Sequence, residues 1–175
     1  MRKLLENVSF EELEIIQEEL AEVFKVIFNT ILDVVKENKK FIVPQFGIFE
    51  LKPQPERIVR NPRTNETIEV PAGNKLIFTA GNFEDIDGMS HFINKLEKLS
   101  YYTLSIDTFM DIFSKIFTTI LEILENDDDI NIAGLGKFKI KYVRIAKEDQ
   151  IEMFRIPATG HLLFKQSPYA KKRLN

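Results

Sequence analysis

The chain has 175 residues, of which 44% are hydrophobic and 29% charged, and its formal net charge is −3. These values are ordinary for a globular protein of one medium domain or two small ones. The absence of cysteine excludes disulfides and thiolate metal sites, and it is typical of a reducing compartment. No apolar run is long enough to span a bilayer, and the first residues lack a signal-peptide core. We therefore expect a cytoplasmic protein with no membrane partner.

The first predicted element is a long helix over residues 10–37. Ser9 can cap this helix, with Glu12 as the return partner in a capping box. Apolar residues recur along it at spacings of three and four, which predicts one wide buried stripe. The stripe consists of Leu20, Phe24, Ile27, Phe28, Ile31, Leu32 and Val35.

A long β-hairpin is predicted next, over residues 41–82. Its first part is rich in β-forming side chains and is broken by Gly47, which indicates a strand, a tight turn and a second strand. Its predicted tip is residues 60–65, where Asn65 can adopt the left-handed conformation that a turn needs. Pro53 and Pro55 interrupt the outgoing strand and predict a distorted stalk.

The second half of the chain repeats the first. After an acidic linker at residues 83–88 and an amphipathic segment at residues 90–100, a helix is predicted from Ser105 to about residue 125. The apolar stripe of this helix matches the first stripe at a constant offset of 89 positions. The matching residues are Phe109, Phe113, Ile116, Phe117, Ile120, Leu121 and Leu124. We interpret this pattern as an internal duplication, with repeats at residues 1–88 and 89–175.

The second hairpin differs from the first. The distance from its turn glycine, Gly136, to its Pro-Ala return is 21 positions, against 24 from Gly47 in the first copy. It contains no Asn-Pro pair, and its predicted tip at residues 147–150 includes two acidic residues. Ser167 and the proline after it can then start a short final helix over residues 168–174. The first copy has no clear counterpart of this helix.

These motifs resemble the HU and integration host factor family of bacterial DNA-bending proteins. The matching residues are Phe46-Gly47-Ile48-Phe49-Glu50, Arg57-x-x-Arg60-Asn61-Pro62-x-Thr64, Ile68-x-Val70-Pro71-Ala72 and Phe78. The resemblance covers nearly the whole chain, twice. It implies an α+β fold of two HU-like repeats, with a helical intertwined base and β-hairpin arms. Family members pair as obligate dimers, so we expect one chain to form a pseudo-dimer; the alternative is a homodimer containing four repeats.

The resemblance also implies a function and a set of residues. It implies binding and bending of duplex DNA with little sequence specificity by a nucleoid-associated architectural protein of bacteria, with Pro62 as the wedge that enters the DNA. The candidate DNA-binding residues are Lys52, Arg57, Arg60, Asn61, Pro62, Arg63, Lys75, Lys137, Lys139, Lys141, Arg144, Arg155, Lys171 and Lys172.

The acidic net charge counts against DNA binding, but the charge is unevenly distributed. Residues 130–175 hold ten Lys and Arg against three Asp and Glu, so the chain can carry a cationic face. The alternative function is a structural or protein-interaction module that kept the fold and lost DNA binding. Under that reading, Pro62 is a turn proline, and the lysines of residues 137–141 and 171–172 are solvated side chains.

No pattern in the chain points to catalysis or to a cofactor. The acidic run at residues 127–129 lacks the glycine and the distal glutamate of a calcium loop. His91 and His161 are isolated, without the spacing of metal ligands. No serine, histidine and carboxylate grouping stands out. We expect no metal, no cofactor and no enzymatic activity.

Overall fold

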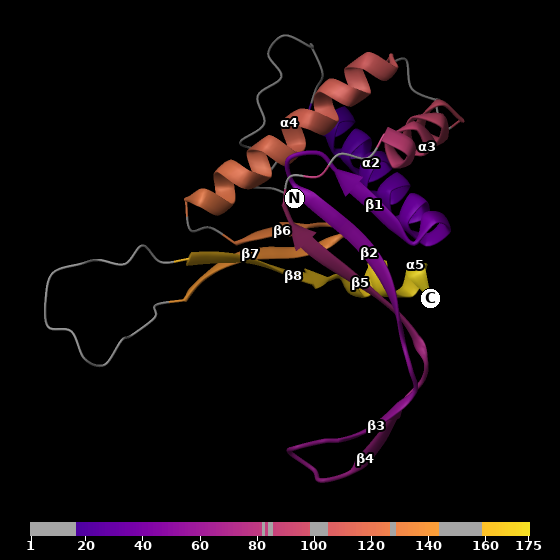
Figure 1. Cartoon of the computed structure of the whole chain (residues 1–175), viewed down its shortest axis with the longest axis vertical. Coiled ribbons are helices and arrows are strands. Elements are labelled where there is room, and N and C mark those ends of the chain that lie inside the picture. Colours follow the sequence, from indigo (N-terminus) through magenta and orange to yellow (C-terminus); the bar gives the residue numbers. More distant parts are fainter. Residues whose placement is uncertain (1–16, 82, 84–85, 99–104, 127–128, 144–158) are drawn as a thin grey trace, which may run out of the picture.

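The computed structural model describes residues 17–81, 83, 86–98, 105–126, 129–143 and 159–175. The helices of this part are α2 (Gln17–Asn38), α3 (Ile86–Lys98), α4 (Ile106–Glu125) and α5 (Pro168–Leu174). The strands are β1 (Lys40–Val43), β2 (Gly47–Gln54), β3 (Arg57–Arg60), β4 (Thr67–Val70), β5 (Gly73–Ala80), β6 (Ile130–Ile132), β7 (Gly136–Val143) and β8 (Thr159–Gln166). Helices α2, α3 and α4 lie on one side of the sheets, and the β3–β4 hairpin projects away from them (Figure 1).

The strand topology is the same in the two halves of the chain. One antiparallel sheet has the order β1-β2-β5, and the other has the order β6-β7-β8. Each sheet follows a long helix, α2 in the first half and α4 in the second. The prediction of an α+β fold built from two repeats is therefore confirmed.

The tight turns show the duplication in atomic detail. A Cβ atom added to Gly47 would lie 2.4 Å from the carbonyl oxygen of Thr79, and one added to Gly136 would lie 2.5 Å from that of Lys165. Each turn also accepts a backbone hydrogen bond from the end of its own hairpin, at Phe46 O from Gly81 N (3.3 Å) and at Leu135 O from Ser167 N. Both copies therefore need glycine at the same place for the same steric reason.

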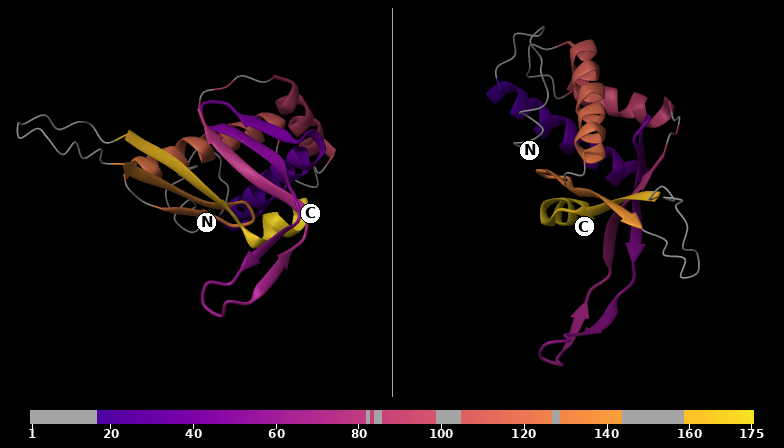
Figure 2. Two further views of the ribbon diagram at one scale, coloured as in Figure 1. Left: turned by 60° about the horizontal axis from the view of Figure 1, so that its bottom comes forward. Right: turned by 90° about the vertical axis from the view of Figure 1, so that its left-hand side faces the viewer.

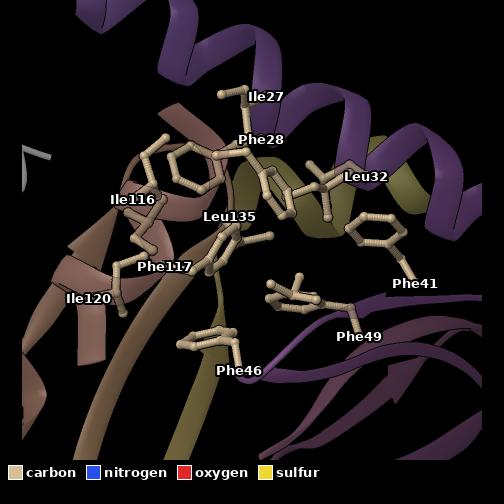
Figure 3. Packing of buried hydrophobic residues seen from close by; sticks show 14 of the residues in the cluster. Ile27, Phe28, Leu32, Phe41, Phe46, Phe49, Ile116, Phe117, Ile120 and Leu135 are labelled. Carbon is tan, nitrogen blue, oxygen red and sulfur yellow. The ribbon is translucent and has the colours of Figure 1, made fainter. Parts of the chain in front are cut away.

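The two repeats share one hydrophobic core. The close-up in Figure 3 shows side chains from α2 and from the first β-turn meeting those of α4 and Leu135. Aromatic contacts cross between the repeats: the ring centroids of Phe28 and Phe117 are 6.4 Å apart, and those of Phe46 and Phe138 are 5.5 Å apart. Phe46 and Phe138 are both buried. Because neither half encloses these rings alone, the base is intertwined as expected for a pseudo-dimer within one chain.

The predicted helix boundaries hold with one exception. Ser105 caps α4 by accepting a hydrogen bond from Thr108 N at 3.1 Å, and Ser167 caps α5 by accepting one from Ala170 N at 2.9 Å. Helix α3 begins at Ile86, so the second half of the predicted acidic linker is helical. The interpreted boundary at residue 88 therefore falls inside a helix. The predicted start of the first helix, with Ser9 and Glu12, lies outside the described residues.

Strands β2 to β5 form a hairpin in two parts, which we call the first arm. Its root is the β2–β5 ladder, which ends where Gln54 pairs with Gly73. Its distal hairpin is the β3–β4 ladder, which begins where Arg57 pairs with Val70. The four residues between them, 55–56 and 71–72, belong to no strand, and two of them are prolines, which cannot donate a ladder hydrogen bond. The expected distortion of the stalk is located at this interruption.

Pro53 lies in the root rather than in a free stalk. It occupies β2 opposite Asn74, beyond Glu50, the last β2 residue that pairs with β1. Strand β2 therefore has a free edge at Pro53, which is where a sheet tolerates proline.

Among the described residues, no helix is long and apolar enough to cross a membrane.

Candidate nucleic-acid interface

The tip of the first arm presents Pro62 to solvent between two exposed arginines. Asn61 holds the turn: its side-chain oxygen accepts a hydrogen bond from Arg63 N at 3.0 Å, and its carbonyl oxygen accepts one from Asn65 N at 2.8 Å. Asn65 has a φ of 63°, the left-handed conformation predicted for it. Arg60, Pro62 and Arg63 are all exposed, so the tip offers a rigid apolar group flanked by cations.

The distal hairpin carries four aliphatic side chains, although it projects into solvent. Paired residues in an antiparallel ladder share a face, so Val59, Ile68 and Val70 lie on one face together with Arg57. Ile58, on the other face, is 68% exposed, and Ile68 is 46% exposed. Both faces of the distal hairpin therefore expose one isoleucine each to solvent.

A groove of about 380 Å³ lies at the junction of the first arm and α5. We call it the root groove. Its cationic lining residues are Arg57 from the arm and Lys171 and Lys172 from α5, and all three are exposed. Its walls also include the interruption of the arm, with Pro55 and Pro71. The structure therefore brings Arg57 of the first repeat together with Lys171 and Lys172 of the second, more than 110 positions later in the sequence.

The outer face of the second sheet carries a group of lysines. Lys137 and Lys139 are exposed on this face, while Phe138 between them is buried. Lys165 pairs with Lys137 across the ladder and shares the face. Asp129 forms ion pairs with both lysines: its Oδ2 lies 2.5 Å from Nζ of Lys137, and its Oδ1 lies 3.5 Å from Nζ of Lys139. The hydrogen bond from Lys137, together with the charge of Lys139, holds the pKa of the Asp129 carboxyl below its ordinary value.

The first sheet has a weaker cationic face than the second. Lys52 and Lys75 pair across the β2–β5 ladder and are both exposed. Glu50 on the same face forms an ion pair with Lys52 at 3.0 Å. The position of Glu50 corresponds to that of Lys139 in the second repeat, at the offset of 89. The outer faces of the two sheets thus differ in charge although their folds match.

The remaining predicted site residues belong to the second hairpin. Lys141 lies in β7, while Arg144, Arg155 and the predicted second tip at residues 147–150 lie outside the described residues. Lys165 was missed, although its place one residue after Phe164 in an alternating strand could have indicated it. Two side-chain amides that join the repeats, those of Gln166 and Asn175, carry no sequence signal of their own.

One cation of α5 is turned away from the root groove. Arg173 donates two hydrogen bonds to Asp33 of α2, from Nε to Oδ1 at 3.0 Å and from Nη2 to Oδ2 at 2.8 Å. This carboxylate raises the pKa of Arg173, so the guanidinium stays charged.

Within the described part of the chain, no group of three or more His, Cys, Asp or Glu could hold a metal ion.

Comparison with known proteins places this geometry in a family. A family model described as "Bacterial DNA-binding protein" matches residues 2–83 and again residues 89–175. The chain belongs to this family of bacterial DNA-binding proteins. The double match agrees with the duplication seen in the turns and sheets.

Individual relatives of the family each match part of this chain. Integration host factor subunit alpha from Anaeromyxobacter sp. (strain Fw109-5) is 32% identical over 75 residues, which are 43% of this chain and 75% of that protein. DNA-binding protein HU 1 from Bacillus subtilis (strain 168) is 35% identical over 75 residues, which are 43% of this chain and 82% of that protein. A solved Anabaena HU–DNA cocrystal structure is 27% identical, with a TM-score of 0.39, and the match covers 58% of this chain and 100% of that chain.

The family consists of non-enzymatic architectural proteins that bind DNA. Membership in it agrees with the expectations of DNA binding and of no enzymatic activity.

Proposed function

We propose that this chain binds duplex DNA with little sequence specificity and bends it mainly with the first arm, as a nucleoid-associated protein of the bacterial cytoplasm. The observation that carries the proposal is the first arm itself, with exposed Pro62 between Arg60 and Arg63 at its tip and the cationic root groove at its base. Cations at both ends of one hairpin can follow a phosphate backbone, and the proline between them can enter a base step.

Low sequence specificity follows from the kind of side chain present. Lysine and arginine on strand faces and in a groove contact phosphates, which carry no base sequence. Asn61 could read a base edge, but its side-chain oxygen already accepts a hydrogen bond from Arg63 N within the turn. Recognition therefore depends on the charge of the DNA and on the ease with which it bends.

The acidic total lowers general affinity without removing the interface. Acidic residues concentrate at positions 11–22 of the sequence, whereas the described cations named above lie on the arm, on the sheet faces and on α5. The net repulsion from DNA predicts weaker nonspecific binding than a basic relative would show. A structural module without DNA binding remains the alternative function, and the ion pairs of Asp129 with Lys137 and Lys139 favour it locally.

The test separates bending from binding. Pro62→Ala removes the wedge and no charge, so it should reduce the bend angle, measured by end-to-end fluorescence transfer on a short duplex, more than it reduces affinity. Unstacking one base step costs a few kcal/mol, and an inserted wedge is what recovers that cost. Shortening residues 147–150 is the matched change in the second hairpin and should alter the bend little. Equal straightening by both variants contradicts bending by the first arm, and no salt-dependent binding at all favours the structural module.

A further inference from the structure

The free edge of β5 is covered by side chains of the second repeat. Strand β5 is an edge of its sheet, so alternate backbone N–H groups point away from β2. Leu76 N donates to Oε1 of Gln166 at 2.6 Å. Two residues earlier, Asn74 N donates to Oδ1 of Asn175, and Nδ2 of Asn175 donates back to the carbonyl oxygen of Asn74 at 3.2 Å. Two carboxamides therefore take the place that a neighbouring strand would occupy.

This attachment lies at the root of the first arm, one residue from its interruption. Gly73 is the last β5 residue paired in the root, and a Cβ atom on it would lie 2.6 Å from Oδ1 of Asn175. Figures 1 and 2 show α5 beside the root in each view, with the distal hairpin extending beyond it. The attachment therefore holds the last paired segment before the prolines.

The helix that carries Asn175 is itself fixed to the base. Besides the paired hydrogen bonds of Arg173 with Asp33, the hydroxyl of Tyr169 donates to Oδ1 of Asn29 at 3.1 Å. Lys36 donates to the carbonyl oxygen of Arg173 at 2.8 Å, and Leu174 is buried. A chain of contacts thus runs from α2 through α5 to the root of the first arm.

In the described part of the first repeat, the counterpart of Gln166 cannot do the same for the second hairpin. In the ladders, Gln166 pairs with Gly136 and Ala80 pairs with Gly47, so Ala80 is the counterpart of Gln166. The methyl group of alanine cannot accept a hydrogen bond. Gly81 and Phe83 are not helical, and the next helix begins at Ile86. Among the described residues, the attachment is therefore found on the first arm alone.

We infer that Gln166 and Asn175 are positioning residues, which hold the root of the first arm at a fixed angle to α5 and thereby present Arg57, Lys171 and Lys172 to DNA as one unit. This inference rests on the proposed function. Neither amide contacts DNA in this role; they act through the arm. Since the distal hairpin joins the root only through residues 55–56 and 71–72, fixing the root fixes the point from which the distal hairpin extends, and with it the direction in which Pro62 approaches the duplex.

The inference can be tested first without DNA. The chain has no cysteine, so Thr64→Cys at the exposed arm tip and Glu125→Cys at the end of α4 allow a pair of spin labels. Gln166→Ala and Asn175→Ala should each broaden the distribution of distances between the labels. Gln166→Ala should also lower the hydrogen-exchange protection of the Leu76 amide by up to about tenfold, the effect of one net hydrogen bond. An unchanged distance distribution in both variants overturns the inference.

The matched control is Asn126→Ala. Nδ2 of Asn126 donates to the carbonyl oxygen of Glu122 at 2.9 Å, just as Nδ2 of Asn175 donates to that of Lys171 at 2.7 Å, so both changes remove a helix C-terminal cap. Only Asn175 also contacts a strand of the first arm. Gly73→Ala adds a methyl group that displaces the Asn175 amide. The double variant with Asn175→Ala should therefore broaden the distance distribution no more than Asn175→Ala alone does. The inference is contradicted if the effects of Gly73→Ala and Asn175→Ala add up in the double variant. It is also contradicted if Asn126→Ala broadens the distribution of label distances.

DNA then distinguishes positioning from general stabilisation. At a temperature well below unfolding, Gln166→Ala should reduce the bend angle per bound complex, and it should flatten the salt dependence of affinity less than removal of Arg57, Lys171 and Lys172 does, because no cation has been removed. A purely structural residue would lower the unfolding temperature and leave the bend angle unaltered, and that result overturns the inference. If the unaltered chain does not bind DNA, the proposed function fails, and the spin-label distances still decide whether the amides hold the arm.

Discussion

Neutralising the root groove should flatten the salt dependence of DNA binding by an amount set by the number of its cations. The change is the triple variant Arg57→Ala, Lys171→Ala and Lys172→Ala. All three side chains are exposed around one groove, and the described structure shows no acidic residue among its lining residues. Each phosphate that a cation neutralises contributes about 0.9 to the slope of log affinity against log salt.

The expected magnitude follows from these three contacts. Losing all of them should reduce the slope by about 2.7. Raising the salt from about 50 mM to about 200 mM should then weaken the variant about 40-fold less than it weakens the unaltered chain. The assay is a fluorescence anisotropy titration of a short duplex at several salt concentrations.

A charge-matched control separates local contacts from net charge. Lys25, Lys98 and Lys115 are exposed, and they belong to α2, α3 and α4, the helices that lie on the side of the sheets away from the first arm (Figure 1). Replacing them with alanine makes the same change in net charge but should leave the slope within about one contact of the original. If both triple variants flatten the slope equally, overall charge governs binding and the root groove is not a phosphate-binding surface.

Two further predictions concern the assembly and its core. Light scattering at micromolar concentration should give a mass near that of one chain, 20.4 kDa, because the two repeats already bury their stripes against each other; a stable mass of twice that value would indicate a homodimer of four repeats. Phe138→Ala, which empties a fully buried position that contacts Phe46 and Phe78 of the other repeat, should destabilise the chain by about 3–5 kcal/mol in denaturant unfolding and do so in a single transition. Two separate transitions would mean that the repeats fold independently.

The fold was predictable where the sequence repeats a strong local pattern. The stripes of the two long helices, the turn glycines Gly47 and Gly136 and the cap Ser105 are local signals, and the structure places them as expected. The start of α3 was predicted too late because Asp87 and Gly88, in its first turn, continue an acidic stretch that looks like a linker. Acidic side chains are also favourable in the first turn of a helix, so composition alone could not separate these possibilities.

The candidate site was predictable in its residues but not in its assembly. Arg57 and the lysines of α5 were named as candidates because of the resemblance to the family. Their meeting in one groove depends on how the repeats pack, which no spacing encodes. The contacts of Gln166 and Asn175 with β5 could not be predicted for the same reason: a side-chain amide has no periodicity, and its partner is a backbone group about 100 positions away.

Fusion of the two repeats removes a constraint that symmetry places on a dimer of identical chains. In such a dimer every substitution appears twice, so an arm cannot be fixed on one side and left unfixed on the other. Here Ala80 and Gln166 occupy equivalent positions and differ. A molecule with two distinguishable ends can lie on DNA in two orientations that are not equivalent. Any neighbour that recognised one end of it would therefore be placed on a defined side of the bend.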